Sequence, residues 1–283
     1  MEDRVTCVPD LRTHLQEAHG LELQDTSDQA FFAVYDGHGG NAAATVLAEQ
    51  LHVAIGVTMM SQGITETSTD LTNIFRLAAS KVDENILFEA KEAEERRRET
   101  HSLLRTSKQG QSAHDHTFGS TAAAVVIRGR QLHCMWVGDS RIVLARGSQP
   151  KPLSRDHKVT DPGEEQRLKQ LGAQIRKGRL FGDLAVSRSF GDRAHKLTGA
   201  LVSTPDVTVE TIQAEDEFVI IACDGIWDVM TNSLAVNLVR RHLRTTKDLR
   251  ACAQKLVDVA LEVGSTDNCS CIVVALQQQL GSE

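Results

Sequence analysis

The chain contains the stretch Phe31-Phe32-Ala33-Val34-Tyr35-Asp36-Gly37, an apolar run that stops at an Asp-Gly pair. A second stretch, Phe218-Val219-Ile220-Ile221-Ala222-Cys223-Asp224-Gly225, has the same form. Each pattern predicts a buried strand that delivers one carboxylate to the point where the chain leaves a sheet. Asp-Gly also suits the two-residue turn of a β-hairpin, but a helical stretch rather than a second strand follows each pair. The pattern therefore favours two metal-binding aspartates.

The composition is that of an ordinary soluble protein, with 283 residues, 41% hydrophobic and 24% charged. A net charge of −7 disfavours a general nucleic-acid binder. The six cysteines form no Cys-x-x-Cys pair, which favours reduced thiols in a cytoplasmic or nuclear protein over a zinc cage or a disulfide framework. We expect no signal peptide, because Met1-Glu2-Asp3-Arg4 is acidic, and no membrane span, because no run approaches about 20 apolar residues.

The remaining pattern predicts strands and helices in separate blocks. Strands are predicted over residues 121–127, 132–137, 142–145, 207–210 and 270–276, and helices over 41–55, 71–98, 164–171, 234–243 and 249–263. Residues 5–28 are interpreted as one strand followed by an exposed loop, and 100–115 as a mobile surface loop. The hairpins in the centre break the strict strand-helix alternation of a doubly wound sheet, so the order favours an α+β fold with helices covering packed sheets.

At five places acidic residues stand where an apolar segment begins or ends. They are Glu2, Asp3, Asp36, Asp139, Asp224, Asp228 and Asp267. All-oxygen ligands suit hard cations such as magnesium or manganese better than zinc, and two such cations can activate a water and clamp a phosphoryl group. For Asp139 and Asp267 an ordinary turn role stays open, as does a plain polar loop role for His38. His114-Asp115-His116 is interpreted as loop composition.

Eight stretches, in a fixed order over essentially the whole chain, carry a resemblance to the metal-dependent protein serine/threonine phosphatases of type 2C. They are Met1-Glu2-Asp3, residues 32–40 with Asp-Gly-His-Gly-Gly, Phe118-Gly119-Ser120-Thr121-Ala122, Val137-Gly138-Asp139-Ser140-Arg141, residues 153–158 with Ser-Arg-Asp-His-Lys, residues 184–192 with Ser-Arg-Ser-Phe-Gly-Asp, residues 222–229 with Asp-Gly-Ile-Trp-Asp, and Thr266-Asp267-Asn268.

The resemblance implies one catalytic domain over residues 1–283. Its fold would be α+β, with two packed antiparallel β-sheets (a β-sandwich) flanked by helix pairs in a four-layer αββα arrangement. In the family, a phosphate-binding arginine and a further strand precede the segment that matches Met1-Glu2-Asp3. We therefore expect this domain to lack both, and Glu2 to be held least firmly.

The resemblance also implies a binding site for two cations, Mg²⁺ or Mn²⁺. Asp36 would bridge the two ions. Asp224 and Asp267 would bind one of them, and Glu2 and the carbonyl of Gly37 would bind the other.

Further roles follow from the same matching positions. Asp139 and Asp228, together with Asp224, would form a third, weaker metal site. Asp3 would orient metal-bound water. His38 would be the general acid that protonates the leaving serine or threonine oxygen, a role that suits a side chain whose pKa lies near neutrality.

We expect hydrolysis of phosphoserine and phosphothreonine by direct attack of a hydroxide held between two metals. The expected partners are phosphoprotein substrates, with no nucleic acid and no membrane, and the chain is expected to be a monomer. Two alternatives stay open. One is a catalytically impaired pseudophosphatase that binds phosphoproteins, and the other is a different two-metal hydrolase such as a nuclease, which the acidic charge disfavours.

Overall fold

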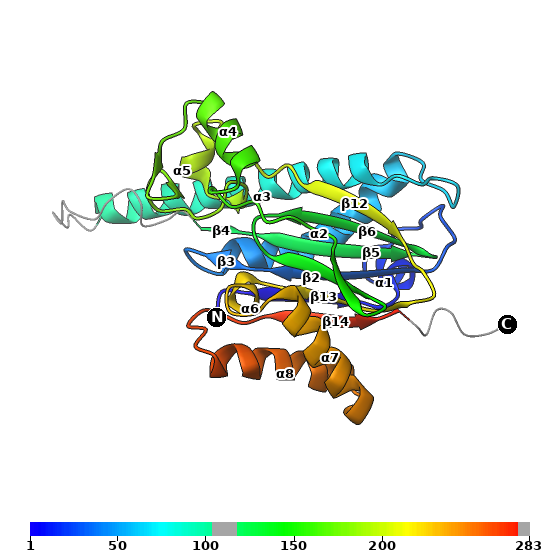
Figure 1. The fold of residues 1–283 in the computed structure, drawn as a ribbon. Helices are drawn as coiled ribbons and strands as arrows, with labels where there is room; N and C mark the ends of the chain where they lie inside the picture. Colours follow the sequence, from blue (N-terminus) through cyan, green and yellow to red (C-terminus); the bar gives the residue numbers. More distant parts are fainter. Residues whose placement is uncertain (104–117, 277–283) are drawn as a thin grey trace.

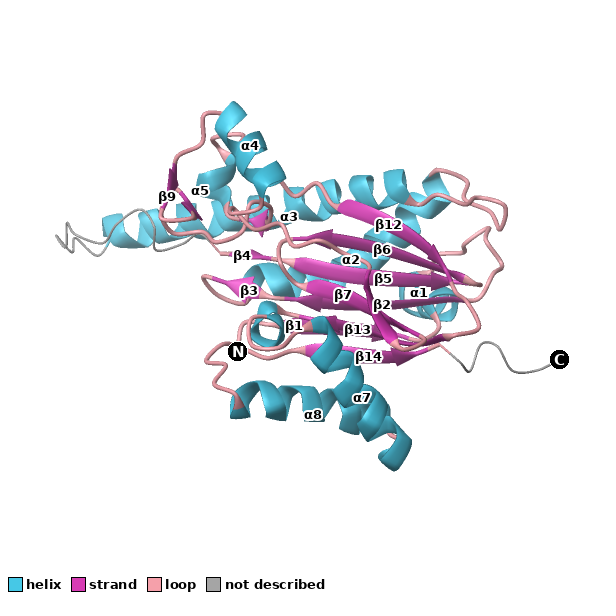
Figure 2. Ribbon diagram, in the orientation of Figure 1, coloured by secondary structure: helices cyan, strands magenta, loops and turns pink. Residues whose placement is uncertain are grey.

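Two antiparallel sheets form the centre of the fold (Figures 1 and 2), which a computed structural model describes for residues 1–103 and 118–276. The larger sheet has the order β1-β2-β5-β6-β12, formed by Arg4–Val8, Gln29–Tyr35, Ala122–Arg128, Gln131–Val137 and Asp206–Thr211. The second has the order β14-β13-β7-β8, formed by Cys271–Ala275, Asp216–Ala222, Arg141–Arg146 and Gln149–Pro152. Two small sheets are β11-β4-β3, formed by Phe190–Gly191, Gly119–Ser120 and Gly37–His38, and β10-β9, formed by Arg179–Leu180 and Ile175–Arg176.

Helices cover the outer faces of both large sheets. On the larger sheet pack α1 (Leu11–His19), α2 (Ala42–Ser61) and α3 (Thr72–Leu103). On the second sheet pack α6 (Asp224–Trp227), α7 (Asn232–Thr246) and α8 (Leu249–Glu262). A smaller unit beside the sheets contains α4 (Pro162–Gln170) and α5 (Arg193–Lys196), and α4 packs there on a hydrophobic cluster of its own.

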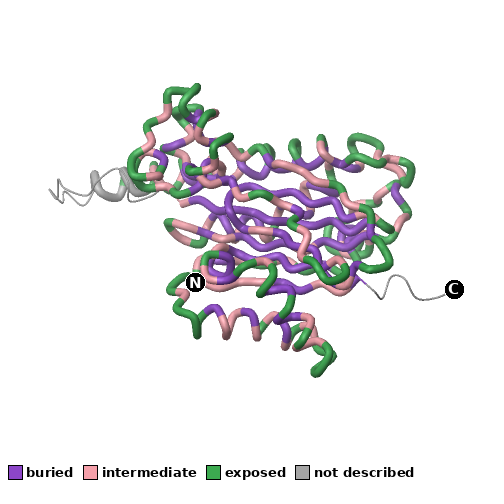
Figure 3. The backbone as a smooth tube through the Cα atoms, viewed as in Figure 1, coloured by how far each residue is buried: buried purple, intermediate pink, exposed green. Residues whose placement is uncertain are grey.

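The apolar runs of β2 and β13 are continuous because both strands are buried on both faces (Figure 3). In β2, Phe31, Ala33 and Tyr35 pack toward α1, α2 and α3. Ala30 and Val34, on the opposite face, join the cluster between the two sheets. Since side chains alternate along a strand, a strand between two layers needs apolar residues at every position. β13 alternates in the same way between that central cluster and the helices α6 to α8.

The predicted α+β class with antiparallel sheets is confirmed, and every predicted strand and helix has a counterpart. The interpretation of residues 5–28 was wrong in part, since α1 stands where an exposed loop was expected. Asp10 caps this helix through Thr13, and Gly20 ends it in the left-handed conformation. Residues 100–103 belong to α3 rather than to a loop. The rest of the predicted mobile loop, including His114-Asp115-His116, lies outside the described residues.

By length and composition alone, α2 could span a membrane, since its mean hydropathy is 1.3 over 18 residues. The sequence expectation, which rested on the absence of a run of about 20 apolar residues, did not identify this helix as a candidate span. Half of that window is buried inside the protein, where Leu47, Leu51 and Ile55 join the cluster against the larger sheet. In this fold α2 is a core helix.

Candidate active site

The predicted acids gather at one end of the two large sheets. Asp3 precedes β1, Asp36 follows β2, Asp139 follows β6, Asp224 follows β13 and Asp267 precedes β14. The strand registers bring these ends together, because Arg4 pairs with Tyr35 in one sheet and Ala222 pairs with both Arg141 and Cys271 in the other. In Figure 1 this end carries the N-terminus, β3 and α6.

The sequence favoured strand ends over hairpin turns at both Asp-Gly pairs, and the structure confirms that neither pair is a hairpin turn. After Asp36 the chain enters β3, which pairs with β4, and after Cys223 it turns directly into α6. Both glycines are needed because other backbone segments pass close to them. A Cβ on Gly37 would lie 2.7 Å from the backbone oxygen of Glu2, and one on Gly225 would lie 2.1 Å from that of Asn268. The glycines thus let the segments that carry Glu2 and Asp267 approach the two aspartates.

Burial and, after it, repulsion between the acids raise the pKa values of the carboxyls at the centre of the site. Burial raises the pKa of Asp36 to about 10, and the charges of Asp224, Asp3 and Asp139 act in the same direction. Burial likewise raises the pKa of Asp139 to about 7, with Asp224 contributing. These carboxyls therefore lose their protons reluctantly unless a cation is present.

Burial also raises the pKa of Asp3 and of Asp224. Asp3 has Ser270, Cys223 and Asp36 as polar neighbours. Even so, neither of its buried carboxylate oxygens makes a geometrically sound hydrogen bond within the described part of the chain. A buried acceptor without a partner is costly, so these oxygens are available to a ligand.

Asp228 and Asp267 lie at the exposed rim of this cluster. Both are close enough to Asp224 to raise its pKa further. Lys158 also reaches the rim, where its Nζ lies 3.0 Å from Asp228 Oδ1 and 3.6 Å from Asp139 Oδ2. Lys158 thus lies between two of the acids that the resemblance assigned to a third metal.

Glu2 was expected to be held least firmly, yet two contacts fix it. Its backbone N–H donates to Asn268 Oδ1 at 2.8 Å, and its carbonyl lies close to Gly37. β1 begins two residues later and pairs with β2 along its whole length. The start of the chain is therefore fastened to the strand end that carries Asp36.

His38 makes a close pair with Asp192, whose Oδ2 lies 2.7 Å from His38 Nε2. Burial lowers the pKa of His38, but the hydrogen bond and the charge of Asp192 outweigh it, and the net pKa is raised. Ser189 Oγ donates to the same oxygen of Asp192 at 2.6 Å. A Cβ on Gly119 would lie 2.2 Å from that oxygen, so only glycine leaves room for the pair.

The residues present fit hard divalent cations. Every candidate ligand is an oxygen, Asp3 and Asp139 are buried while Asp36 and Asp224 are half-buried, and the oxygens of Asp3 have no partner among the described residues. In the same part of the chain, no three of these acids bring their oxygens within 4.8 Å of one another. Asp224, Asp3 and Asp139 are nevertheless all close enough to Asp36 for their charges to raise its pKa.

Sequence reasoning missed three residues that the structure adds to the site, Asp192, Asn268 and Lys158. All three lie inside the stretches that carry the family resemblance, but no role was assigned to them. Asp192 ends the stretch 184–192 after a glycine and has a positive φ of 48°. In the sequence, the Gly191-Asp192 pair is typical of a turn, and this is the local signal that could have pointed to it.

The sequence model of the family described as "Protein phosphatase 2C" matches residues 1–269. The chain belongs to this family. It is 35% identical over 281 residues to "Probable protein phosphatase 2C 43" of Arabidopsis thaliana, covering 97% of this chain and 62% of the relative. It is 33% identical over 288 residues to "Protein phosphatase 1B" of Homo sapiens, covering 97% and 54%. The chain therefore spans little more than half the length of these relatives.

Solved structures show the same fold. The "Structure of a C.elegans sex determining protein" matches with a TM-score of 0.77 at 23% identity, covering 97% of this chain and 61% of the other. A serine-threonine phosphatase 2C from Toxoplasma gondii matches with a TM-score of 0.68 at 20% identity, covering 96% and 94%. At these identities the likeness concerns the fold alone.

Proposed function

We propose that the chain is a magnesium- or manganese-dependent protein phosphatase that hydrolyses phosphoserine and phosphothreonine. The observation that carries this proposal is the set of buried and half-buried carboxylates at the shared end of the two sheets, which raise one another's pKa values. A phosphatase of this family implies phosphoprotein substrates. The acids that the sequence singled out thus supply a negatively charged site that suits cations. Cations bound there would in turn attract a phosphoryl group.

Five groups would hold two cations. Asp36 would contact both, Asp224 and Asp267 one of them, and Glu2 and the Gly37 carbonyl the other. Bound there, the cations would lower the pKa of a water molecule and neutralise charge on the phosphoryl group. The central position of Asp36 supports its bridging role, since Asp224 and Asp3 both act on it.

The remaining acids would act around this centre. Asp139 and Asp228, with Asp224, would hold a third and weaker ion. Asp3 would accept hydrogen bonds from the attacking water and so orient it, which its unpartnered oxygens support.

His38 would protonate the leaving serine or threonine oxygen. Its raised pKa keeps the ring protonated closer to neutral pH, as a general acid requires. Because Asp192 engages Nε2, the proton would leave from Nδ1. Asp192 itself would position the ring and stabilise its charged form.

Hydrolysis of a phosphothreonine peptide with and without Mn²⁺ tests the proposal. We expect turnover that requires Mn²⁺ or Mg²⁺ and is abolished by Asp224→Asn. Asp248→Asn is the matched control, because Asp248 is an exposed helix cap on α8 where asparagine caps equally well. Activity that survives excess chelator would rule the mechanism out. Tight phosphopeptide binding without turnover, measured by calorimetry, would instead identify a pseudophosphatase.

We also propose that the sheets and helices form the four-layer αββα arrangement of one catalytic domain, and that the domain is a monomer of the cytoplasm or nucleus. Clusters on both outer faces of the sheets and between them support the layering. Six free cysteines support a reducing compartment. Light scattering of the eluting protein, which gives its mass, tests the monomer.

A further inference from the structure

Three histidines converge at a place remote from the carboxylates. His14 and His19 come from α1, and His52 comes from α2. One ligand nitrogen from each lies within 4.8 Å of the other two, which no other trio of potential ligands among the described residues achieves. The three rings lie 5.2 to 6.2 Å apart between centroids.

The spacing of the nitrogens matches a metal coordination shell. His14 Nε2 and His52 Nε2 lie 3.2 Å apart. In a tetrahedral zinc site with Zn–N bonds of about 2.0–2.1 Å, neighbouring nitrogens are roughly 3.3 Å apart. A direct hydrogen bond between the two rings has a similar length, but it does not account for the approach of His19.

The buried member of the trio is ready to bind. His52 is only 5% exposed, and its Nε2 faces His14 Nε2. Burial, with the neighbouring rings of His14 and His19, lowers the pKa of His52 to about 4. The ring is therefore neutral near pH 7, which is the form that ligates metals.

The C-terminal end of α1 and the solvent-exposed side of the three histidines also suit a cation. His19 is the last residue of α1, where the helix dipole favours positive charge. His19 is exposed and His14 half-buried, so an ion can enter from solvent. A water molecule would complete a tetrahedral shell at that open side.

We propose that His14, His19 and His52 form a zinc-binding site that fastens α1 to α2. Three imidazoles select zinc or a neighbouring transition metal rather than magnesium or manganese. The site is separate from the carboxylates. The ring centroids of His52 and Phe31 are 5.8 Å apart, and Phe31 stands five residues before Asp36, which is about 17 Å along a strand. Because β1 and α1 directly follow Glu2 and Asp3, zinc here would fasten the segment that carries them.

Cobalt absorption spectroscopy tests this site independently of catalysis. The full chain is saturated with Mg²⁺ and titrated with Co²⁺, then with Zn²⁺ as competitor. We expect one equivalent of Co²⁺ with the strong visible bands of a tetrahedral nitrogen site, displaced by Zn²⁺. The double variant His14→Gln/His19→Gln should bind at least tenfold more weakly and lose those bands. Both positions are accessible to solvent, so the variant should fold, whereas replacement of the buried His52 risks a cavity.

Two controls separate the possible outcomes. His242→Gln, on α7, should bind as the unchanged protein does, and Asp224→Asn should keep the visible bands. Zn²⁺ should also raise the melting temperature of the unchanged protein by on the order of 5 °C, and not that of the double variant. Equal cobalt spectra in the unchanged protein and the double variant, or loss of the bands in Asp224→Asn alone, would overturn the proposal. Neither result bears on phosphatase activity.

Discussion

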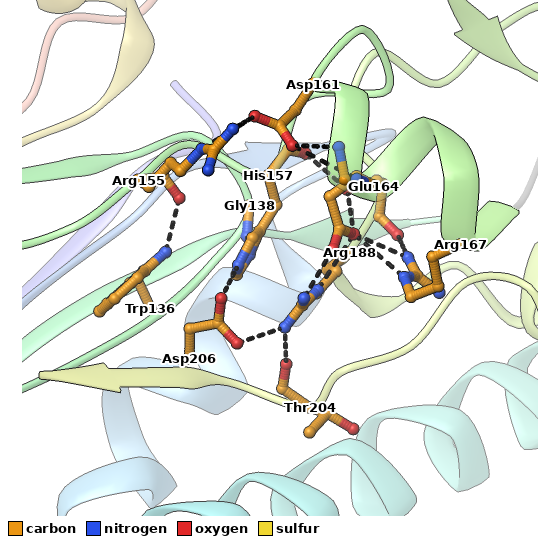
Figure 4. Close-up of polar contacts among 12 residues, drawn as sticks. Trp136, Gly138, Arg155, His157, Asp161, Glu164, Arg167, Arg188, Thr204 and Asp206 are labelled. Carbon is orange, nitrogen blue, oxygen red and sulfur yellow. Dashed lines mark hydrogen bonds and ion pairs between the residues drawn. The ribbon is translucent and has the colours of Figure 1, made fainter.

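The carboxylate cluster at the sheet ends and the ion network around α4 both gather buried acids, but charge is balanced in only one of them. In the network (Figure 4), Arg188 donates to Glu164 and to Asp206, joining α4 to the start of β12. Burial alone would raise the pKa of Glu164, but hydrogen bonds from Arg188 and Arg167 lower it to about 2. In the cluster, burial raises the pKa of Asp36 to about 10, since its neighbours there are other acids.

The network also fixes the tautomer of its histidine, His157. Gly138 N–H donates to His157 Nδ1 at 3.2 Å, so Nε2 carries the proton and donates to Asp206. That hydrogen bond, with a further one from Arg188, holds the pKa of Asp206 below its usual range against the effect of burial. Acids that accept hydrogen bonds from arginine or histidine side chains of the protein stabilise the fold. Acids that lie close together without such donors are suited to bind cations from solution.

Removing the arginine from the network should give the largest effect. Arg188→Met leaves Glu164 and Asp206 without their shared partner, and because Arg167 still pairs with Glu164 we expect the lower end of the about 3–5 kcal/mol that breaking a buried pair costs. We expect a loss of this order in the free energy of unfolding, measured with urea. Arg155→Met is the control, because the Arg155 side chain is 75% exposed and its pair with Asp161 should contribute only about 0–1 kcal/mol. Similar losses in both variants would contradict the contrast between network and cluster.

The pH dependence of stability should separate the two regions next. In the metal-free protein, Asp139 has a higher pKa folded, about 7, than unfolded, about 3.8. The folded state then holds the extra proton, so the contribution of Asp139 to stability is complete below about pH 4 and is lost as the pH rises to 7. Mn²⁺ should remove this decline by stabilising the ionised carboxyls. Melting temperatures of dialysed protein at several pH values, with and without Mn²⁺, measure it.

The network should behave in the opposite sense. Glu164 has a lower pKa folded, about 2, than unfolded, about 4.5. Its contribution is complete above pH 4.5 and is lost as the pH falls toward 2, and Mn²⁺ should not change this. Parallel curves with and without Mn²⁺ over the whole range would show that the cluster is already balanced.

The contrast also explains how far the sequence could be interpreted. β2 and β13 were predictable because burial on both faces makes their apolar runs continuous, and their Asp-Gly ends located the site. α1 was missed because only Leu11 and Leu15 are buried in it. Its caps, Asp10 and Gly20, were the available signal.

Pairings between distant segments could not be predicted. Asp192 lies 154 residues from His38, and Asn268 lies 266 residues from Glu2. No local pattern encodes such partners, since they depend on how β3, β4 and the α8–β14 loop pack. The network around Arg188 has the same character, because Glu164 and Asp206 belong to separate elements.

Asp192→Asn should have a smaller effect, because it changes only the partner of His38 beside the cluster. The substitution keeps the shape of the side chain but removes the charge that raises the pKa of His38. We expect kcat to fall about 10- to 100-fold, with the decline at high pH moved to lower pH. Asp183→Asn is the control, because Asp183 pairs with His195 at 3.2 Å and has no contact with His38. An unchanged pH profile of kcat would mean that Asp192 has only a structural role.

Lys158→Met should give the smallest effect and the finest test of the comparison. Lys158 plays the part in the cluster that Arg188 plays in the network, because its Nζ lies close to two acids, Asp228 and Asp139. Removing this cation leaves two acids at the rim free to bind a metal. We therefore expect the Mn²⁺ concentration for half-maximal activity to fall a few-fold, with little change in kcat.

Lys151→Met is the matched control, because Lys151 pairs with Glu210 on β12, outside the cluster. It should leave the Mn²⁺ requirement unchanged. A higher Mn²⁺ requirement in Lys158→Met would mean that the lysine holds the rim acids in place for the metal rather than competing with it. The rim would then resemble the Arg188 network, where a fixed cation organises the acids around it, and only the buried centre around Asp36 would depend on ions from solution.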